Sequence, residues 1–209
     1  MKIIGVNGIH NWSKSNNSFT DKILARLSLE YDVVDVEYPR MLAILGWLPW
    51  SVNRRAKLVA EAITGPDDVI IAHSFGCLAT LRAMQLYGAR VRKVIFFAAA
   101  AEVDEPIPDN FQVLYNIHSS ADLALKLGYV LPLHSFGKMG HSGALTDNPN
   151  VVNVDAAGHD HDDYVHPKNI CDWVDVVRAM IQGTFDPSMV PTNKLPLPRS
   201  QPPVTLGRL

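Results

Sequence analysis

The stretch 68–76, which reads Asp-Val-Ile-Ile-Ala-His-Ser-Phe-Gly, constrains the fold of this chain most. Its short apolar run breaks at Ser74, which has a small residue two positions away on each side, Ala72 and Gly76. A strand that turns sharply into a helix strains the residue at the turn, and small neighbours at these positions avoid a clash. The pattern therefore indicates an exposed, nucleophilic serine. Serine also commonly caps helices, so the rest of the chain must separate the two interpretations.

Length and composition favour one domain of ordinary size. The chain has 209 residues, 47% of them hydrophobic, and a formal net charge of −2, which favours neither disorder nor nucleic acid as a partner. Cys77 and Cys171 both lie in apolar helical patterns, as reduced core thiols do. The sequence has no apolar run long enough for a membrane span and no signal-peptide core near Met1, so we expect a cytoplasmic protein.

Strand and helix patterns alternate along the chain, which predicts an α/β fold, a three-layer α/β/α sandwich around a mainly parallel sheet of about six strands. The expected strands are 2–7, 31–38, 68–72, 91–98, 112–117 and 150–155. The expected helices include one that begins near Ser18 and the segments 51–64, 75–87 and 167–182. Only residues 99–111 separate the fourth strand from the fifth, which leaves no room for a cap domain.

The chain changes character after residue 183. Prolines are frequent from there on and no apolar period continues, which predicts a domain over 1–183 and a Pro-rich tail over 184–209. We expect the tail to be extended and able to mediate homo-oligomer formation. A second unusual segment, 41–50, is apolar where a connection should be polar. It is either a buried loop or a wall of a substrate pocket, and the latter makes Trp47 and Trp50 substrate-binding residues.

Polar residues follow several of the expected strands. Ser74 follows the third strand, Asp122 the fifth and His159 the sixth, while Gly8 and His10 follow the first. In a doubly wound parallel sheet the carboxyl ends of the strands meet at one edge, where chemistry gathers. Acyl transfer needs a nucleophile, a base, an acid that orients the base, and donors for an oxyanion, and this edge offers candidates for all of them.

The chain order Ser74, Asp122, His159, with a turn between the third strand and an apolar helix, resembles the α/β-hydrolase superfamily. The turn Ala-His-Ser-Phe-Gly is similar to that of small lidless bacterial lipases, and the resemblance extends over about residues 2–182. It implies a minimal α/β-hydrolase without a cap domain. It also implies that Ser74 is the nucleophile and that the N–H groups of Phe75 and Ile9 form the oxyanion hole. Relatives usually have His-Gly where this chain has Asn7 and Gly8, which leaves the bracing of that loop open.

The acid and the base each have alternatives. We prefer Asp122 as the acid over Asp104 and Glu102, which follow the fourth strand, although Asp122 could instead cap a helix. We prefer His159 as the base because it matches the common Gly-His placement after the last strand. His161 and His166 lie a few residues on. The other histidines, His10, His73, His134 and His141, are expected at the surface or along the pocket, with His10 facing the substrate.

The stretch from His159 to His166 also resembles a cluster of metal ligands, but a solvated acidic loop needs fewer assumptions. We therefore predict no metal and no cofactor. The predicted function is a serine hydrolase that cleaves a carboxylic ester or thioester in a small molecule through an acyl-enzyme on Ser74. The alternatives are peptidase, C–C hydrolase or perhydrolase chemistry on the same triad, or a noncatalytic binding or scaffold protein with this fold.

Overall fold

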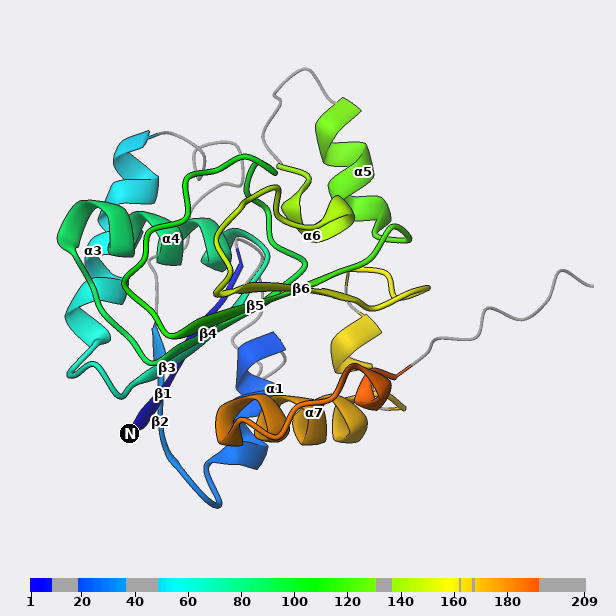
Figure 1. Ribbon diagram of the computed structural model, residues 1–209, viewed down its shortest axis with the longest axis horizontal. Helices are drawn as coiled ribbons and strands as arrows, with labels where there is room; N and C mark the ends of the chain where they lie inside the picture. The colour runs from blue at the N-terminus through cyan, green and yellow to red at the C-terminus, as the bar shows by residue number, and fades with distance from the viewer. Residues whose placement is uncertain (9–18, 37–48, 131–136, 162, 167, 192–209) are drawn as a thin grey trace, which may run out of the picture.

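The computed structural model describes residues 1–8, 19–36, 49–130, 137–161, 163–166 and 168–191. Its centre is one six-stranded sheet with the order β2-β1-β3-β4-β5-β6, in which every neighbouring pair is parallel (Figure 1). The strands are β1 Lys2–Val6, β2 Asp32–Val36, β3 Val69–His73, β4 Lys93–Phe97, β5 Val113–His118 and β6 Val151–Asp155. The predicted α/β/α sandwich around a parallel sheet of about six strands is confirmed.

Helices cover both faces of the sheet. On one face lie α1 (Phe19–Leu27) and α7 (Ile170–Gln182), and on the other lie α3 (Pro49–Ala62) and α4 (Phe75–Tyr87), as Figure 1 shows. Two helices, α5 (Leu123–Val130) and α6 (Met139–Ser142), follow β5, and α6 was not predicted from the sequence. The observed α4 has the predicted bounds, whereas α7 begins three residues later than expected.

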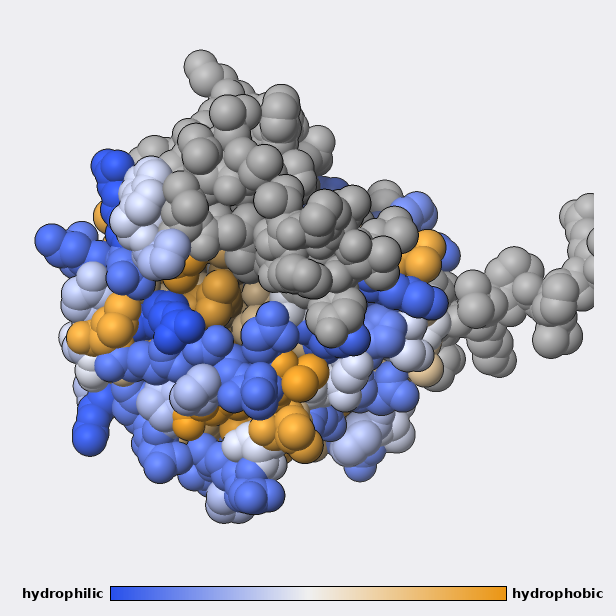
Figure 2. Space-filling view, turned by 90° about the horizontal axis from the view of Figure 1, so that it is seen from above, coloured by the Kyte–Doolittle hydropathy of each residue, from blue (hydrophilic) through white to orange (hydrophobic). Residues whose placement is uncertain are grey.

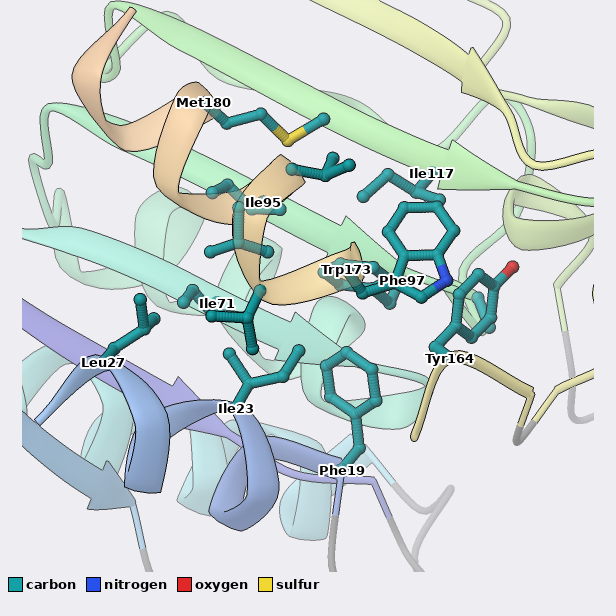
Figure 3. Close-up of a cluster of buried hydrophobic side chains, with 14 of the residues drawn as sticks. Phe19, Ile23, Leu27, Ile71, Ile95, Phe97, Ile117, Tyr164, Trp173 and Met180 are labelled. Atoms are coloured by element: carbon teal, nitrogen blue, oxygen red, sulfur yellow. The ribbon is translucent and has the colours of Figure 1, made fainter. Parts of the chain in front are cut away.

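The two sheet faces bury two separate apolar clusters, as expected for strands covered on both sides. The cluster under α1 and α7 contains an aromatic group, Phe19, Phe97, Tyr164 and Trp173, shown in Figure 3. Their rings meet edge-on or tilted, with centroids 4.6 to 5.4 Å apart between Phe97 and each of the other three. Such ring pairs fix the orientation of the rings as well as bury apolar surface, so this aromatic group gives rigid support to the residues that pack on it. It lies next to the loop that follows β6.

The connection between β4 and β5 has no cap domain. Residues 98–112 are all described and form only turns and bends. The predicted tail begins in contact with the main domain, because Phe185 packs against Tyr115 of β5 and Val190 contacts the cluster under α7. Residues 192–209 lie outside the described part of the chain. The boundary at residue 183 and association through the tail therefore stay predictions.

The prediction of two buried cysteines is confirmed for Cys77 and wrong for Cys171. Cys77 is buried in α4, but Cys171 is exposed on α7, because it lies on the face of that helix that points away from the sheet. On the described part of the face in Figure 2, apolar residues form small patches that hydrophilic residues separate, as is ordinary for a protein surface. None of the described helices combines the length and the apolar character that crossing a bilayer requires.

Candidate active site

Ser74 lies at the sharp turn between β3 and α4, in a conformation that is rare for a residue with a side chain. Its φ is 55° and its ψ is −122°, which costs on the order of 1–3 kcal/mol. The end of β4 holds it there: Ser74 N–H donates to the Phe97 carbonyl at 2.9 Å, and Ala100 N–H donates to the Ser74 carbonyl at 3.1 Å. The Ser74 side chain makes no helix-capping hydrogen bond. This geometry favours the nucleophile interpretation of the sequence over the cap.

Glycines bring the neighbouring backbone close to this turn. A Cβ atom on Gly76 would lie 2.2 Å from the Val6 carbonyl oxygen, so α4 can start at the end of β1 only with glycine there. A Cβ atom on Gly8 would lie 3.0 Å from the Ser74 Cβ. The loop after β1 therefore begins directly beside the serine, where an oxyanion loop is needed.

Three side chains form a continuous hydrogen-bonded chain at the carboxyl edge of the sheet. His161 Nε2 lies 3.1 Å from Ser74 Oγ, and His161 Nδ1 lies 2.8 Å from Asp122 Oδ2. Because a carboxylate only accepts hydrogen bonds, Nδ1 carries the hydrogen and Nε2 accepts from the serine hydroxyl. Asp122 is fully buried, Ser74 is nearly so, and the His161 side chain retains 17% of its exposure. This is the arrangement of a base poised to take the serine proton.

Asp122 occupies the position predicted for the acid. Its second oxygen, Oδ1, accepts the Leu125 N–H at 3.0 Å, so the residue caps α5 as well as contacting the histidine. The cap interpretation of Asp122 is therefore confirmed, and its role as the acid stays a prediction. The alternatives Asp104 and Glu102 are exposed and neither contacts the Ser74–His161 pair among the described residues.

The histidine in contact with Ser74 is His161, so the prediction of His159 was wrong. After β6 the chain makes a turn at Ala156–His159, with Gly158 at φ 81°, and this turn directs the His159 ring into the core. His159 is fully buried, its Nδ1 contacts the Ala156 carbonyl at 3.2 Å, and its ring stacks on Tyr164. Burial lowers the pKa of His159, although the Ala156 carbonyl opposes this.

The loop leaves the core again two residues later. Asp160 Oδ1 accepts the N–H of Leu123 at the start of α5, at 2.9 Å, and the N–H of His161, at 2.8 Å. These bonds attach the loop to the same helix end that carries the acid, and the His161 ring then faces Ser74. The Gly-His pair alone does not show whether its histidine points into the core or toward the site. The direction depends on which ring packs against Tyr164 and Trp173 of the aromatic group.

His73, expected at the surface or along the pocket, is instead 8% exposed. It stacks on Phe19 with ring centroids 4.7 Å apart, and its Nε2 lies 3.2 Å from the His161 carbonyl oxygen. Burial, with a contribution from the nearby His161, lowers the pKa of His73 to about 3. The residue next to Ser74 therefore also contacts the backbone of His161.

The loop after β1 is braced by Asn7, where relatives have histidine. Asn7 is 5% exposed; its Nδ2 donates to both Asp35 oxygens, at 3.1 and 3.3 Å, and its Oδ1 accepts the Thr20 N–H at 3.2 Å. Thr20 Oγ1 also donates to Asp35. The network joins the ends of β1 and β2 to the first turn of α1, so it fixes both ends of the connecting loop. Asparagine thus supplies bracing that the sequence left open.

Of the remaining predicted site residues, Phe75 and Trp50 lie among the described residues. Phe75 lies where its backbone can contribute to an oxyanion hole, at the first position of α4, and its ring contacts the guanidinium of Arg55 at 4.8 Å. Ile9, His10 and Trp47 lie outside the described residues. Trp50 is 55% exposed at the start of α3. Within the described ranges, no three histidine, cysteine or acidic side chains are grouped closely enough to hold a metal ion.

Comparisons with known proteins agree with this geometry. Residues 50–126, which include Ser74 and Asp122, match the protein family described as "Serine hydrolase". No curated protein matches the sequence.

Solved structures share the fold at low sequence identity. Alpha/beta hydrolase domain-containing protein 10 from mouse has a TM-score of 0.58 at 12% identity, covering 87% of this chain and 90% of its own. A YdeN-like hydrolase from Pectobacterium atrosepticum has a TM-score of 0.54 at 14% identity (88% and 92% covered). A hydrolase of the alpha/beta superfamily from Xanthomonas campestris has 0.53 at 13% (87% and 97% covered). Taken with the sheet order and the strained serine turn, these likenesses show that the chain has the fold of these alpha/beta hydrolases.

Proposed function

We propose that this protein is a serine hydrolase that cleaves a carboxylic ester or thioester through an acyl-enzyme on Ser74. The observation that carries the proposal is the hydrogen-bonded chain from Ser74 Oγ through the His161 ring to Asp122 Oδ2, at 3.1 and 2.8 Å. The match of residues 50–126 to the serine hydrolase family supports the general class of reaction.

In the proposed mechanism, His161 Nε2 takes the proton as Ser74 Oγ bonds to the substrate carbonyl carbon. Asp122 holds the ring in the required tautomer and stabilises the imidazolium that forms. The backbone N–H groups of Phe75 and Ile9 are proposed to stabilise the oxyanion. His161 then returns the proton to the leaving alcohol or thiol, and a water molecule activated by the same base releases the acid.

The proposed substrate follows from the connection between β4 and β5, where residues 98–112 form only turns and bends. We propose that no cap domain inserted at this point covers the site and that the substrate is a small-molecule ester with an apolar acyl group, as in lipase-like enzymes. We propose that Trp50 contacts the acyl group, with Trp47 and His10 as further contacts. A set of esters of increasing acyl length tests this: Trp50→Ala should weaken the preference for long chains, and an unchanged preference would contradict a role for Trp50.

The central test is labelling with a fluorophosphonate, followed by mass spectrometry to locate the adduct. We expect labelling of Ser74 that disappears in Ser74→Ala and falls sharply in His161→Ala. Failure to label Ser74 under conditions that label a control esterase would overturn the proposal and favour a noncatalytic binding protein with this fold. For a labelled protein, matched esters, thioesters and amides then separate esterase from thioesterase and peptidase activity.

A further inference from the structure

His73 is buried between the nucleophile and the base without being part of the triad. It is the last residue of β3 and is bonded directly to Ser74. Since side chains alternate along a strand, Ala72 belongs to the cluster under α4, whereas His73 points to the opposite face, where Phe19 and the loop after β6 lie. Its ring is 4.9 Å from the His161 ring.

Among the residues that the structure describes, the His73 side chain makes its polar contact with the backbone of His161. Its Nε2 lies 3.2 Å from the His161 carbonyl oxygen, and because a carbonyl only accepts, Nε2 carries the hydrogen. The stack on Phe19, at 4.7 Å and 18°, fixes the plane of the ring and so aims this N–H. Because the pKa of His73 is held at about 3, the ring stays neutral at ordinary pH and adds no second positive charge beside His161.

We propose that His73 is a positioning residue, which fixes the separation of Ser74 and His161 by bonding the base's backbone to the strand that carries the nucleophile. This inference rests on the proposed function of the triad. His161 also donates its own N–H to Asp160 and contacts Asp122 and Ser74 through its ring, and Asp160 and Asp122 both lie on the side of α5. The His73 bond is therefore a direct link between the histidine loop and the serine strand. Without it, the proton donor and acceptor can drift apart even when each half of the site is intact.

A matched pair of variants tests the link. His73→Gln places an amide N–H near the position of Nε2 and keeps the donor, whereas His73→Phe keeps the flat ring on Phe19 and removes it. We expect His73→Phe to lower kcat by about 10- to 100-fold with little change in KM, and His73→Gln to retain most of the activity. Ile71→Val, two residues earlier on the same face of β3, controls for simple loosening of the core.

A spectroscopic readout tests the link in the resting protein, whether or not a substrate is known. The hydrogen shared by His161 Nδ1 and Asp122 should give a downfield proton NMR signal in the wild type, His73→Gln and Ile71→Val. In His73→Phe we expect it to broaden or vanish. Equal signals and equal kcat in both His73 variants would overturn the inference while leaving Ser74 labelling, and so the proposed function, intact. Absence of Ser74 labelling with the signal lost only in His73→Phe would overturn the proposed function and keep the link.

Discussion

The serine turn (residues 73–76) and the histidine loop (residues 156–166) meet at two hydrogen bonds, which join Ser74 and His73 to His161, but are held in place by different means. The serine turn is held by backbone contacts: the Phe97 carbonyl, the Ala100 N–H and the close approach of Gly76 to β1. The histidine loop is held by the Leu123 N–H at the start of α5, which Asp160 accepts, and by the rings of the aromatic group. Small residues around Ser74 indicate the first region in the sequence, whereas no local pattern indicates the ring packing that orients the second.

The largest expected effect separates the two histidines of the loop. His161→Ala removes the proposed base and should lower kcat on the order of 10⁶-fold, as loss of a triad histidine does. His159→Phe keeps an aromatic ring on Tyr164 and should leave kcat nearly unchanged, while the lost bond to Ala156 lowers the unfolding free energy by about 1 kcal/mol. Ester hydrolysis and urea unfolding of both variants measure the two effects. A greater loss of kcat in His159→Phe than in His161→Ala would reverse the assignment.

A smaller kinetic effect is expected at the acid. Asp122→Asn can still accept the Leu125 N–H, so α5 and the unfolding free energy should change little. The amide presents N–H groups to His161 Nδ1, which favours the tautomer with hydrogen on Nε2 and deprives Ser74 of its acceptor. We expect kcat to fall on the order of 10⁴-fold. Steady-state kinetics measures kcat, and thermal unfolding is the control. A fall in Tm that accompanies the fall in kcat would contradict the prediction, because the activity would then be lost through destabilisation of the fold.

For the serine turn, we expect the largest effect from a substitution that disturbs packing rather than hydrogen bonding. Gly76→Ala puts a methyl group 2.2 Å from the Val6 carbonyl oxygen, which forces α4 away from β1. We expect a loss of about 3 kcal/mol in unfolding free energy, since backbone cannot yield as a side chain does. Gly65→Ala is the matched control, because a Cβ there meets nothing within 4 Å. Equal stability of the two variants in urea unfolding would show that the close approach is not limiting.

This contrast explains how far the sequence alone could lead. Six parallel strands, the bounds of α4, the serine turn and Asp122 all follow from short-range patterns: apolar runs, small residues around Ser74, and a cap residue before a helix. The choice between His159 and His161 could not be made this way. Both follow Gly158 within three residues, and the ring that turns inward is selected by Tyr164 and Trp173, which lie further along the chain and pack on it only in the folded state.

His73 and Cys171 illustrate the same limit. The pattern around Ser74 requires small residues at 72 and 76 but says nothing about residue 73, whose burial depends on Phe19 arriving from α1. Cys171 lies in an apolar helical period, yet the described structure exposes it, because one residue of rotation on α7 decides between core and solvent. Patterns of period 2 or 3.6 identify a face, and the assembled sheet decides which faces are covered.

The smallest expected effect concerns the far end of the strand that carries Ser74. Asp68 precedes β3 and accepts the N–H groups of Lys2, Thr64 and Gly65 and the Thr64 hydroxyl, at 2.8 to 3.1 Å. Burial raises the pKa of Asp68, but the hydrogen bonds from Thr64, Lys2 and Gly65 outweigh it and hold this pKa below its usual value. A carboxyl whose pKa is lowered by folding stabilises the protein above its unfolded pKa, about 3.9, and loses that contribution as the pH falls through the folded pKa.

Asp68→Asn should therefore lower the unfolding free energy by about 1 kcal/mol at pH 7, and the difference from the wild type should shrink as the pH falls below the unfolded pKa and through the lower folded pKa of Asp68. Urea unfolding at a series of pH values measures it, with Asp67→Asn as the control on the exposed neighbour. If the serine strand is as rigidly held as its neighbours indicate, fluorophosphonate labelling of Ser74 at pH 7 should proceed at the wild-type rate in Asp68→Asn. A slower rate at full folding would mean that the serine turn, like the histidine loop, depends on contacts far from it.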